Sequence, residues 1–210
     1  KVAVIDDGIF PEHPYISKFM DIKNLSIVRQ SFANTVFTHK VQEVAAENAG
    51  ALALKVKIAH IGIVALALIM RLLQVANPST PIFSYLGSGI AVGEIIFLIV
   101  QLTFNFEQVA IAHKNSALKY MQLRDKYRGL IVDIMNEQVS QDTIADRRNS
   151  LQAEYQVISD LAPQTGTKEY AEAQERLHTA GASGEEHYTW SDVEIDQFLP
   201  QKLRLVSISE

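Results

Sequence analysis

Two long apolar stretches in the middle of the chain, residues 58–76 and 81–104, lie four residues apart. Each is close to the roughly 20 helical residues that cross a hydrocarbon core of about 30 Å. The intervening Asn-Pro-Ser-Thr-Pro segment contains two prolines, which interrupt a helix and favour a tight turn. The sequence therefore predicts a transmembrane helical hairpin. The alternative is a pair of buried helices in a soluble domain, but 210 residues leave too few other apolar side chains to enclose them.

Basic residues next to the spans predict the orientation of the hairpin. They precede the first span and follow the second, whereas residues 72–86 at the tip carry no charge. By the positive-inside rule, both termini are expected in the cytoplasm. The same basic residues suit the anionic headgroups of a lipid bilayer. The C-terminal part is acidic and the net charge is -5, so no nucleic acid binding is predicted. The basic residues are Lys40, Lys55, Lys57, Lys114, Lys119, Arg124, Lys126 and Arg128.

The chain divides into three parts, and the expected fold is mainly α, a membrane hairpin with a long cytoplasmic helical extension. Residues 1–33 form a short N-terminal piece that we expect to be α/β-like, because residues 2–5 and 25–28 have the composition of strands. Residues 34–138 contain the hairpin with its flanking amphipathic helices. Residues 139–210 form a helical C-terminal region on the cytoplasmic side.

Helical periodicity extends well beyond the two spans. An apolar face before the first span, which includes Val36, Val41 and Val44, predicts a helix that continues through Gly50 into the membrane. After the second span, apolar residues recur at helical spacing as far as Met135, which predicts one long rod that needs partner helices. These partners are expected at residues 142–161, with Asp142 as N-cap, and 167–179, and in a short helix opened by the capping-box pair Ser191 and Glu194 and interrupted by Pro200.

Four polar residues lie within the predicted spans: His60 and Arg71 in the first, Glu94 and Gln101 in the second. An ionised carboxylate in the middle of a bilayer is costly, so Glu94 is a functional candidate. A hairpin that turns near Ser79 places it at about the depth of Leu66, with Arg71 within reach. The alternatives are a role lining a pore and a structural role, either paired with Arg71 or protonated and hydrogen-bonded between helices.

Three glycines make the second span suitable for close helix packing. Gly89 and Gly93 have the GxxxG spacing, and Gly87 precedes them. Because a single hairpin cannot enclose a conducting path, a pore would require a homo-oligomer. Glu94 and Gln101 are then the residues expected to contact water.

Catalytic interpretations have little support in the sequence. Residues 2–9, followed by His13-Pro14, resemble the aspartate box of subtilisin-like serine proteases, with Asp6 as the triad carboxylate, but the histidine and serine boxes are missing. The same residues resemble the start of a response-regulator receiver domain; the simplest interpretation is an edge strand that ends in an Asp-Gly turn. The adjacent residues 185–187, Glu-Glu-His, do not converge on one ion. We predict no enzyme, no catalytic residue, no metal and no cofactor.

The order of elements resembles the SLATT family of two-transmembrane effectors. The resemblance covers about residues 35–177 and rests on the amphipathic approach, the two spans, and two short patterns: Ala117-x-x-Tyr120-x-x-Leu123-x-x-x-Tyr127-x-x-Leu130, and Tyr155-x-x-Ile158 leading to Ala162-Pro163 and Tyr170. It implies a bacterial anti-phage effector of the inner membrane that acts with a sensor or nucleotide-signalling partner protein, forms a pore on infection and arrests the cell (abortive infection). The N-terminal piece departs from the usual core of the family.

Three functions remain open at this point. The first is an oligomeric effector that forms a pore or disrupts the membrane, in which the cytoplasmic helices hold the spans closed. The second is a membrane anchor or scaffold for a soluble sensor or enzyme, in which Glu94 would be replaceable by Gln. The third is a subtilase-like protease fragment dependent on Asp6, which would require the missing boxes on another chain.

Overall fold

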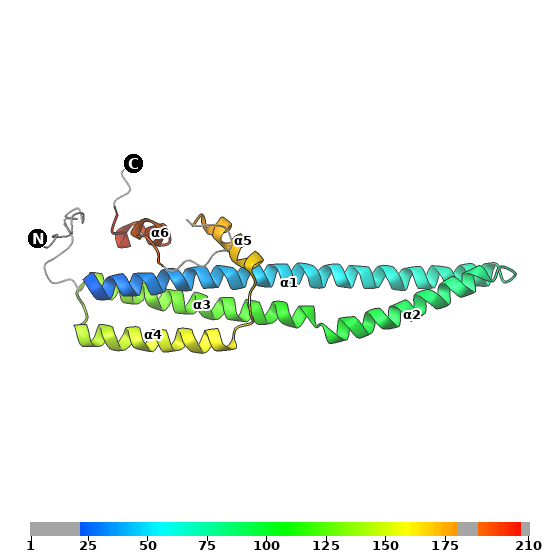
Figure 1. The fold of residues 1–210 in the computed structure, drawn as a ribbon, viewed down its shortest axis with the longest axis horizontal. Helices are drawn as coiled ribbons and strands as arrows, with labels where there is room; N and C mark the ends of the chain where they lie inside the picture. The colour runs from blue at the N-terminus through cyan, green and yellow to red at the C-terminus, as the bar shows by residue number, and fades with distance from the viewer. Residues whose placement is uncertain (1–21, 180–188, 207–210) are drawn as a thin grey trace, which may run out of the picture.

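The computed structural model describes residues 22–179 and 189–206, and within them every regular element is helical (Figure 1). The expected class, a mainly α protein with two long apolar helices, is confirmed. Residues 2–5, expected as a strand, lie outside the described residues. Residues 25–28, expected as a second strand, are helical, because Leu25 and Val28 belong to a buried face with helical spacing that continues to Phe32. The elements are α1 Ile22–Ala76, α2 Ile82–Thr103, α3 Phe106–Met135, α4 Gln141–Leu161, α5 Thr167–Leu177, α6 Asp192–Gln197 and the short 3-10 helix η1 Gln201–Leu203.

Helix α1 is a single rod of 55 residues, about 80 Å long at 1.5 Å per residue. It continues without a break through Gly50, as predicted. Its first half is buried on one side by helices α3 to α6, and no residue after Ala53 in α1 is fully buried. The sequence of α1 therefore combines a bundle helix with a membrane span (Figure 1).

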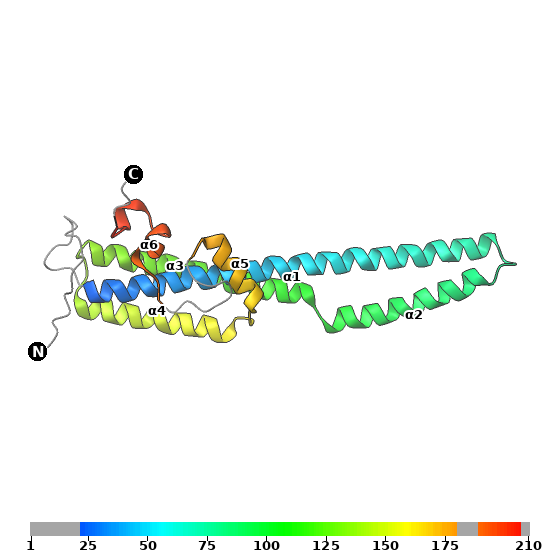
Figure 2. The ribbon, with the colours of Figure 1, turned by 45° about the horizontal axis from the view of Figure 1, so that its top comes forward.

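The sequence predicts one long rod from the second span to Met135, but the structure has two helices there, α2 and α3. Helix α2 ends at Thr103, and Phe104 leaves the helical conformation. Asn105 then caps α3, because its side-chain oxygen accepts a hydrogen bond from the Gln108 backbone N–H at 3.2 Å. As a result, α2 lies farther from α1 at this junction than at the tip of the hairpin (Figure 2).

The half of the molecule away from the hairpin is a bundle in which α1, α3 and α4 run side by side and α5 and α6 pack across α1 (Figures 1 and 2). The apolar stripe predicted after the second span fills its core: Tyr120, Leu123 and Tyr127 are at most 1% exposed. The predicted partner helices form, with Ser140 instead of Asp142 as the N-cap of α4 and with the capping box at Ser191 intact. The main core residues from the other helices are Val28, Phe32, Val36, Val44, Ile144, Leu151, Ile158, Ala173 and Ile195.

The other half of the molecule exposes its apolar side chains. In each of the two long apolar segments, only 6% of the most apolar 18-residue stretch is buried. Ile61, Leu72 and Leu102, for example, are 69%, 70% and 81% exposed. A helix in the core of a soluble domain would be mostly covered, so the alternative of two buried helices is wrong for the described chain. The hairpin α1–α2 is long and apolar enough to cross a bilayer.

Candidate functional site

Helix α2 has two distinct faces, and the sequence-predicted residues divide between them. Gly87, Glu94 and Gln101 are seven residues apart, which places them on one side of a helix, and this side faces α1. Gly87 is buried, and a Cβ atom added to it would lie 3.6 Å from the Cβ of Met70. We call this side the inner face. The distance of 3.6 Å leaves room for a methyl group but not for a large side chain, so a small residue at position 87 lets α1 and α2 approach closely near the tip.

Gly89 and Gly93 lie on the opposite side, which we call the outer face. A Cβ atom added to either glycine would meet nothing within 4 Å. Ile96, which continues this side by helical spacing, is 58% exposed. The GxxxG pair therefore does not pack the hairpin against itself, and its flat surface is open to lipid or to another helix.

Glu94 faces α1 next to His60. The distance between Glu94 Oε1 and His60 Nε2 is 4.0 Å, and each side chain is about a quarter exposed. The His60 ring also lies against Phe97, with 5.7 Å between the ring centroids. Among the described residues, the His60 imidazole is the basic group nearest to the Glu94 carboxylate, and the two side chains form a polar pair inside the span.

The predicted contact between Glu94 and Arg71 does not form. Arg71 is exposed and donates to Gln74 Oε1 on its own helix at 3.1 Å. Glu94 meets α1 at His60 instead of near Leu66, an offset of about 9 Å along the helix. A residue count from the turn assumes that the two helices start level with each other there, and it does not give their offset along the axis.

Gln101 lies in a cavity at the base of the hairpin, next to the bundle, where α2 separates from α1. The cavity has a volume of about 340 Å³. The Oε1 atom of Gln101 is buried and has no hydrogen-bond partner. Lys57 of α1 and Glu107 of α3 border the cavity and form an ion pair of 2.7 Å. His60 lines the same cavity, so the polar groups of the hairpin follow one another from its base to Glu94.

A second polar cluster, which the sequence did not indicate, joins the two ends of the described chain. The Arg29 side chain is fully buried, and its Nη2 donates to Asp196 Oδ1 at 2.6 Å and to Asp192 Oδ1 at 3.3 Å. Asp196 Oδ2 also accepts from the backbone N–H groups of Leu205 and Val206, at 3.0 and 2.8 Å. We call residues 190–206 the C-terminal clamp, because they dock on the start of α1 through these bonds.

Trp190 fixes the other end of the clamp. Its indole Nε1 donates to Asn34 Oδ1 at 2.6 Å, and its backbone exchanges two hydrogen bonds with the Gln30 side chain. The ring packs against Phe37 and Phe198, with centroid distances of 5.6 and 6.2 Å. Trp190 is only 4% exposed. The sequence shows an aromatic residue in a polar segment here, but it does not show which helix the indole contacts.

A buried polar bridge connects α1, α3 and the loop that follows α4. His113 Nδ1 of α3 lies 2.7 Å from Gln42 Oε1 of α1, and Gln42 Nε2 donates to the carbonyl of Pro163 at 3.1 Å. Burial lowers the pKa of His113, and the charge of Glu169 opposes this effect. The neutral imidazole therefore donates from Nδ1 to the Gln42 amide oxygen and ties α3 to α1.

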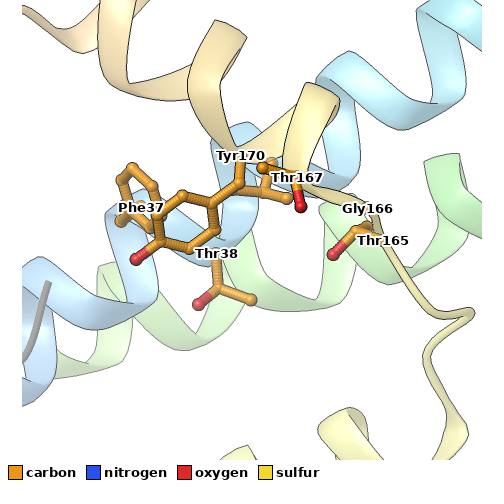
Figure 3. Close-up of a pocket in the computed structure, with 7 residues that line it drawn as sticks. Phe37, Thr38, Thr165, Gly166, Thr167 and Tyr170 are labelled. Atoms are coloured by element: carbon orange, nitrogen blue, oxygen red, sulfur yellow. The ribbon is translucent and has the colours of Figure 1, made fainter. Parts of the chain in front are cut away.

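The bundle also holds an open pocket of about 370 Å³ beside the start of α5 (Figure 3). Figure 3 shows Tyr170 next to Phe37, in an edge contact of 4.6 Å, with the threonine side chains of this pocket nearby. The lining contains no charged side chain, and the N-cap backbone N–H of Gly166 is already bonded to Glu169 Oε2 at 3.0 Å. The pocket therefore has no cationic side chain in its lining that could pair with a nucleotide phosphate. Its lining residues are Phe37, Thr38, Val41, Thr165, Gly166, Thr167 and Tyr170.

The described residues contain no cluster of side chains suited to bind a metal ion. Within residues 22–179 and 189–206, no three His, Asp or Glu side chains are placed to share an ion. Asp6 and residues 185–187, considered above for a protease and for a metal, lie outside the described residues.

Comparison with known proteins agrees with this architecture. A search of curated proteins and a search of solved structures both return no match. A family model described as SMODS and SLOG-associating 2TM effector domain family 4 matches residues 25–194, which is well over half of the chain. The match extends on both sides of the segment that carries the sequence resemblance and includes the bundle and the hairpin. The chain therefore belongs to this family of two-transmembrane effector domains, the SLATT family, and is a membrane protein of that type.

Proposed function

We propose that this protein is the membrane effector of a bacterial anti-phage system, and that on activation it oligomerises and opens a pore. The observation that carries the proposal is the division of α2 into a polar inner face with Glu94 and Gln101 and an open outer face with Gly89 and Gly93. The first supplies groups that tolerate water, and the second supplies a surface for close packing. One hairpin has too few helices to enclose a path, so several copies are required.

Glu94 supplies the physical reason for association. In an isolated hairpin, the Glu94 and His60 side chains each keep about a quarter of their surface exposed at the depth of the lipid. An ionised carboxylate in that position costs about 3 kcal/mol even on the most permissive scales. When copies associate with the open side of this contact toward a shared lumen, the carboxylate contacts water and the cost is removed.

We assign the activation of this protein to a partner protein. The family description names association with SMODS and SLOG proteins, and we propose that such a sensor or nucleotide-signalling partner acts on this chain through the cytoplasmic bundle. Basic residues flank the bundle side of the spans, so we place the bundle and both termini in the cytoplasm and the protein in the bacterial inner membrane.

Membrane potential measured in bacteria that express the chain tests the pore. Wild type should depolarise the membrane rapidly, and Glu94→Ala at matched protein level should depolarise it more weakly. Ile95→Ala is the matched control, because Ile95 is the next residue, is 59% exposed and faces lipid. No depolarisation with the native partner and trigger present would reject the pore and favour the membrane anchor. Full activity of Glu94→Gln would show that the charge of Glu94 is not required for the pore.

Chemical cross-linking in membranes tests the outer face. Gly89→Leu adds a bulky side chain where α2 is open, and should reduce the cross-linked oligomer without disturbing the hairpin. Gly62→Leu is the control, because Gly62 of α1 is equally open but lies on the other helix. Equal oligomer yield from Gly89→Leu and wild type would show that the GxxxG pair is not the interface.

A further inference from the structure

The cavity at the base of the hairpin has a mostly apolar lining that includes several polar and charged side chains. It lies between α1 and α2, next to the break that ends α2 at Thr103, and Lys57, His60, Gln101 and Glu107 contribute polar atoms to it. Apolar cavities of this size stay dry, whereas polar ones take up water. At about 30 Å³ for each water molecule, a volume of about 340 Å³ accommodates on the order of ten.

Gln101 brings a polar amide to this cavity, between the two spans. Its Oε1 atom is buried without a hydrogen-bond partner, and such an atom costs about 1–3 kcal/mol if nothing satisfies it. A rotation of the amide toward the cavity would let this oxygen accept a hydrogen bond from water. Gln101 would therefore be more stable beside water than beside lipid.

The cavity also leads toward the carboxylate in the middle of the span. His60 lines the cavity and lies 4.0 Å from Glu94. At the mouth, the charges of Lys57 and Glu107 offset each other in an ion pair of 2.7 Å, so the group that sets the local charge is Glu94. A carbonyl oxygen and a carboxylate favour cations over anions. The helix break contributes directly, because it moves the base of α2 away from α1 (Figure 2).

We propose that this cavity is a water-filled vestibule in the resting protein, open on the bundle side, that admits water and small cations toward Glu94. The proposal rests on the proposed pore for its use, since the vestibule would be the cytoplasmic end of that path. Its existence does not depend on oligomerisation or on a trigger, because all of its walls come from one chain.

Reaction of single cysteines with a charged thiol reagent tests the vestibule, and the chain contains no cysteine of its own. Leu98 lines the cavity, whereas its neighbour Ile99 is 59% exposed on the lipid side. In inside-out vesicles without any trigger, Leu98→Cys should react with a trimethylammonium methanethiosulfonate at least about tenfold faster than Ile99→Cys. The reason is that thiolate forms in water and is suppressed in an apolar environment.

Two further measurements test the existence of the vestibule and its preference for cations separately. The anionic sulfonate reagent should react more slowly than the cationic one with Leu98→Cys, and the added substitution Glu94→Gln should remove that difference. Equal rates at Leu98→Cys and Ile99→Cys, with both variants retaining wild-type Trp190 fluorescence, would overturn the vestibule. An equal rate for both reagents would overturn its preference for cations. If Leu98→Cys reacts rapidly but the protein does not depolarise the membrane, the pore is rejected and the vestibule is retained.

Discussion

Replacing Asp196 by Ala tests what holds the C-terminal clamp on α1. Asp196 is 1% exposed and is the closest partner of the fully buried Arg29, at 2.6 Å. Removing one partner of a buried ion pair costs about 3–5 kcal/mol, because the other charge stays desolvated. The bond from Arg29 to Asp192 at 3.3 Å remains in the variant, so we expect a value near the lower limit, about 3 kcal/mol.

The loss should appear first as detachment of the clamp and not as unfolding of the whole bundle. Asp196→Ala also leaves the backbone N–H groups of Leu205 and Val206 without their acceptor. These donors and Arg29 regain water if residues 190–206 leave α1. The cost therefore cannot exceed the free energy that docks the clamp, and a change of about 3 kcal/mol lowers the docked-to-detached ratio by roughly 150-fold.

The fluorescence of Trp190 reports this equilibrium directly, because the chain has a single tryptophan. The indole is 4% exposed in the docked clamp, so detachment should shift its emission to longer wavelength and lower the urea midpoint in detergent micelles. Asp192→Ala is the control: Asp192 contacts the same guanidinium but is 45% exposed, and should cost less than about 1 kcal/mol. Identical emission and midpoint for the two variants would refute the role of the buried pair.

Three smaller predictions concern single contacts. Burial lowers the pKa of His113, so the unfolded chain binds more protons below about pH 6.5 and stability should fall as the pH is lowered from 8 to 5.5; thermal unfolding of His113→Gln should show a flatter dependence. Tyr120→Phe loses a 2.9 Å hydrogen bond to Ser159 and should lower the free energy of unfolding by about 1 kcal/mol, measured by urea titration. Gly87→Leu should separate the helix pair at Met70 and reduce a disulfide engineered between α1 and α2 near the tip, whereas Gly87→Ala should not.

The helices themselves are predictable from local patterns in the sequence. The two spans follow from apolar length, and α6 follows from the capping box at Ser191 and Glu194, because the residues that decide these features are close together in the chain. The break after Thr103 is harder to predict. Asn105 followed three residues later by Gln108 is a helix-start signal, but the apolar residues keep helical spacing across the break and obscure it.

The contacts between distant segments are the part that the sequence does not provide. Whether Glu94 meets Arg71 or His60 depends on the offset of α2 along α1, and a residue count carries no information on that offset. Arg29 could have been read as a surface cation, because its partners on α6 are more than 160 residues away. The two glycines of the GxxxG pair could be recognised, but the structure was needed to show that they face away from α1.

The difference between α1 and the α2–α3 pair bears on how a partner could act under the proposed function. Helix α1 is unbroken from Ile22, close to where the clamp docks at Arg29, to Ala76 at the tip. Its backbone hydrogen bonds form one continuous ladder, so a rotation or shift of the bundle end moves the first span with it. The break between α2 and α3 interrupts that ladder and can absorb the same motion through a few dihedral angles. A displacement of the bundle would therefore move α1 relative to α2, and the contact it would change first is the one between His60 and Glu94.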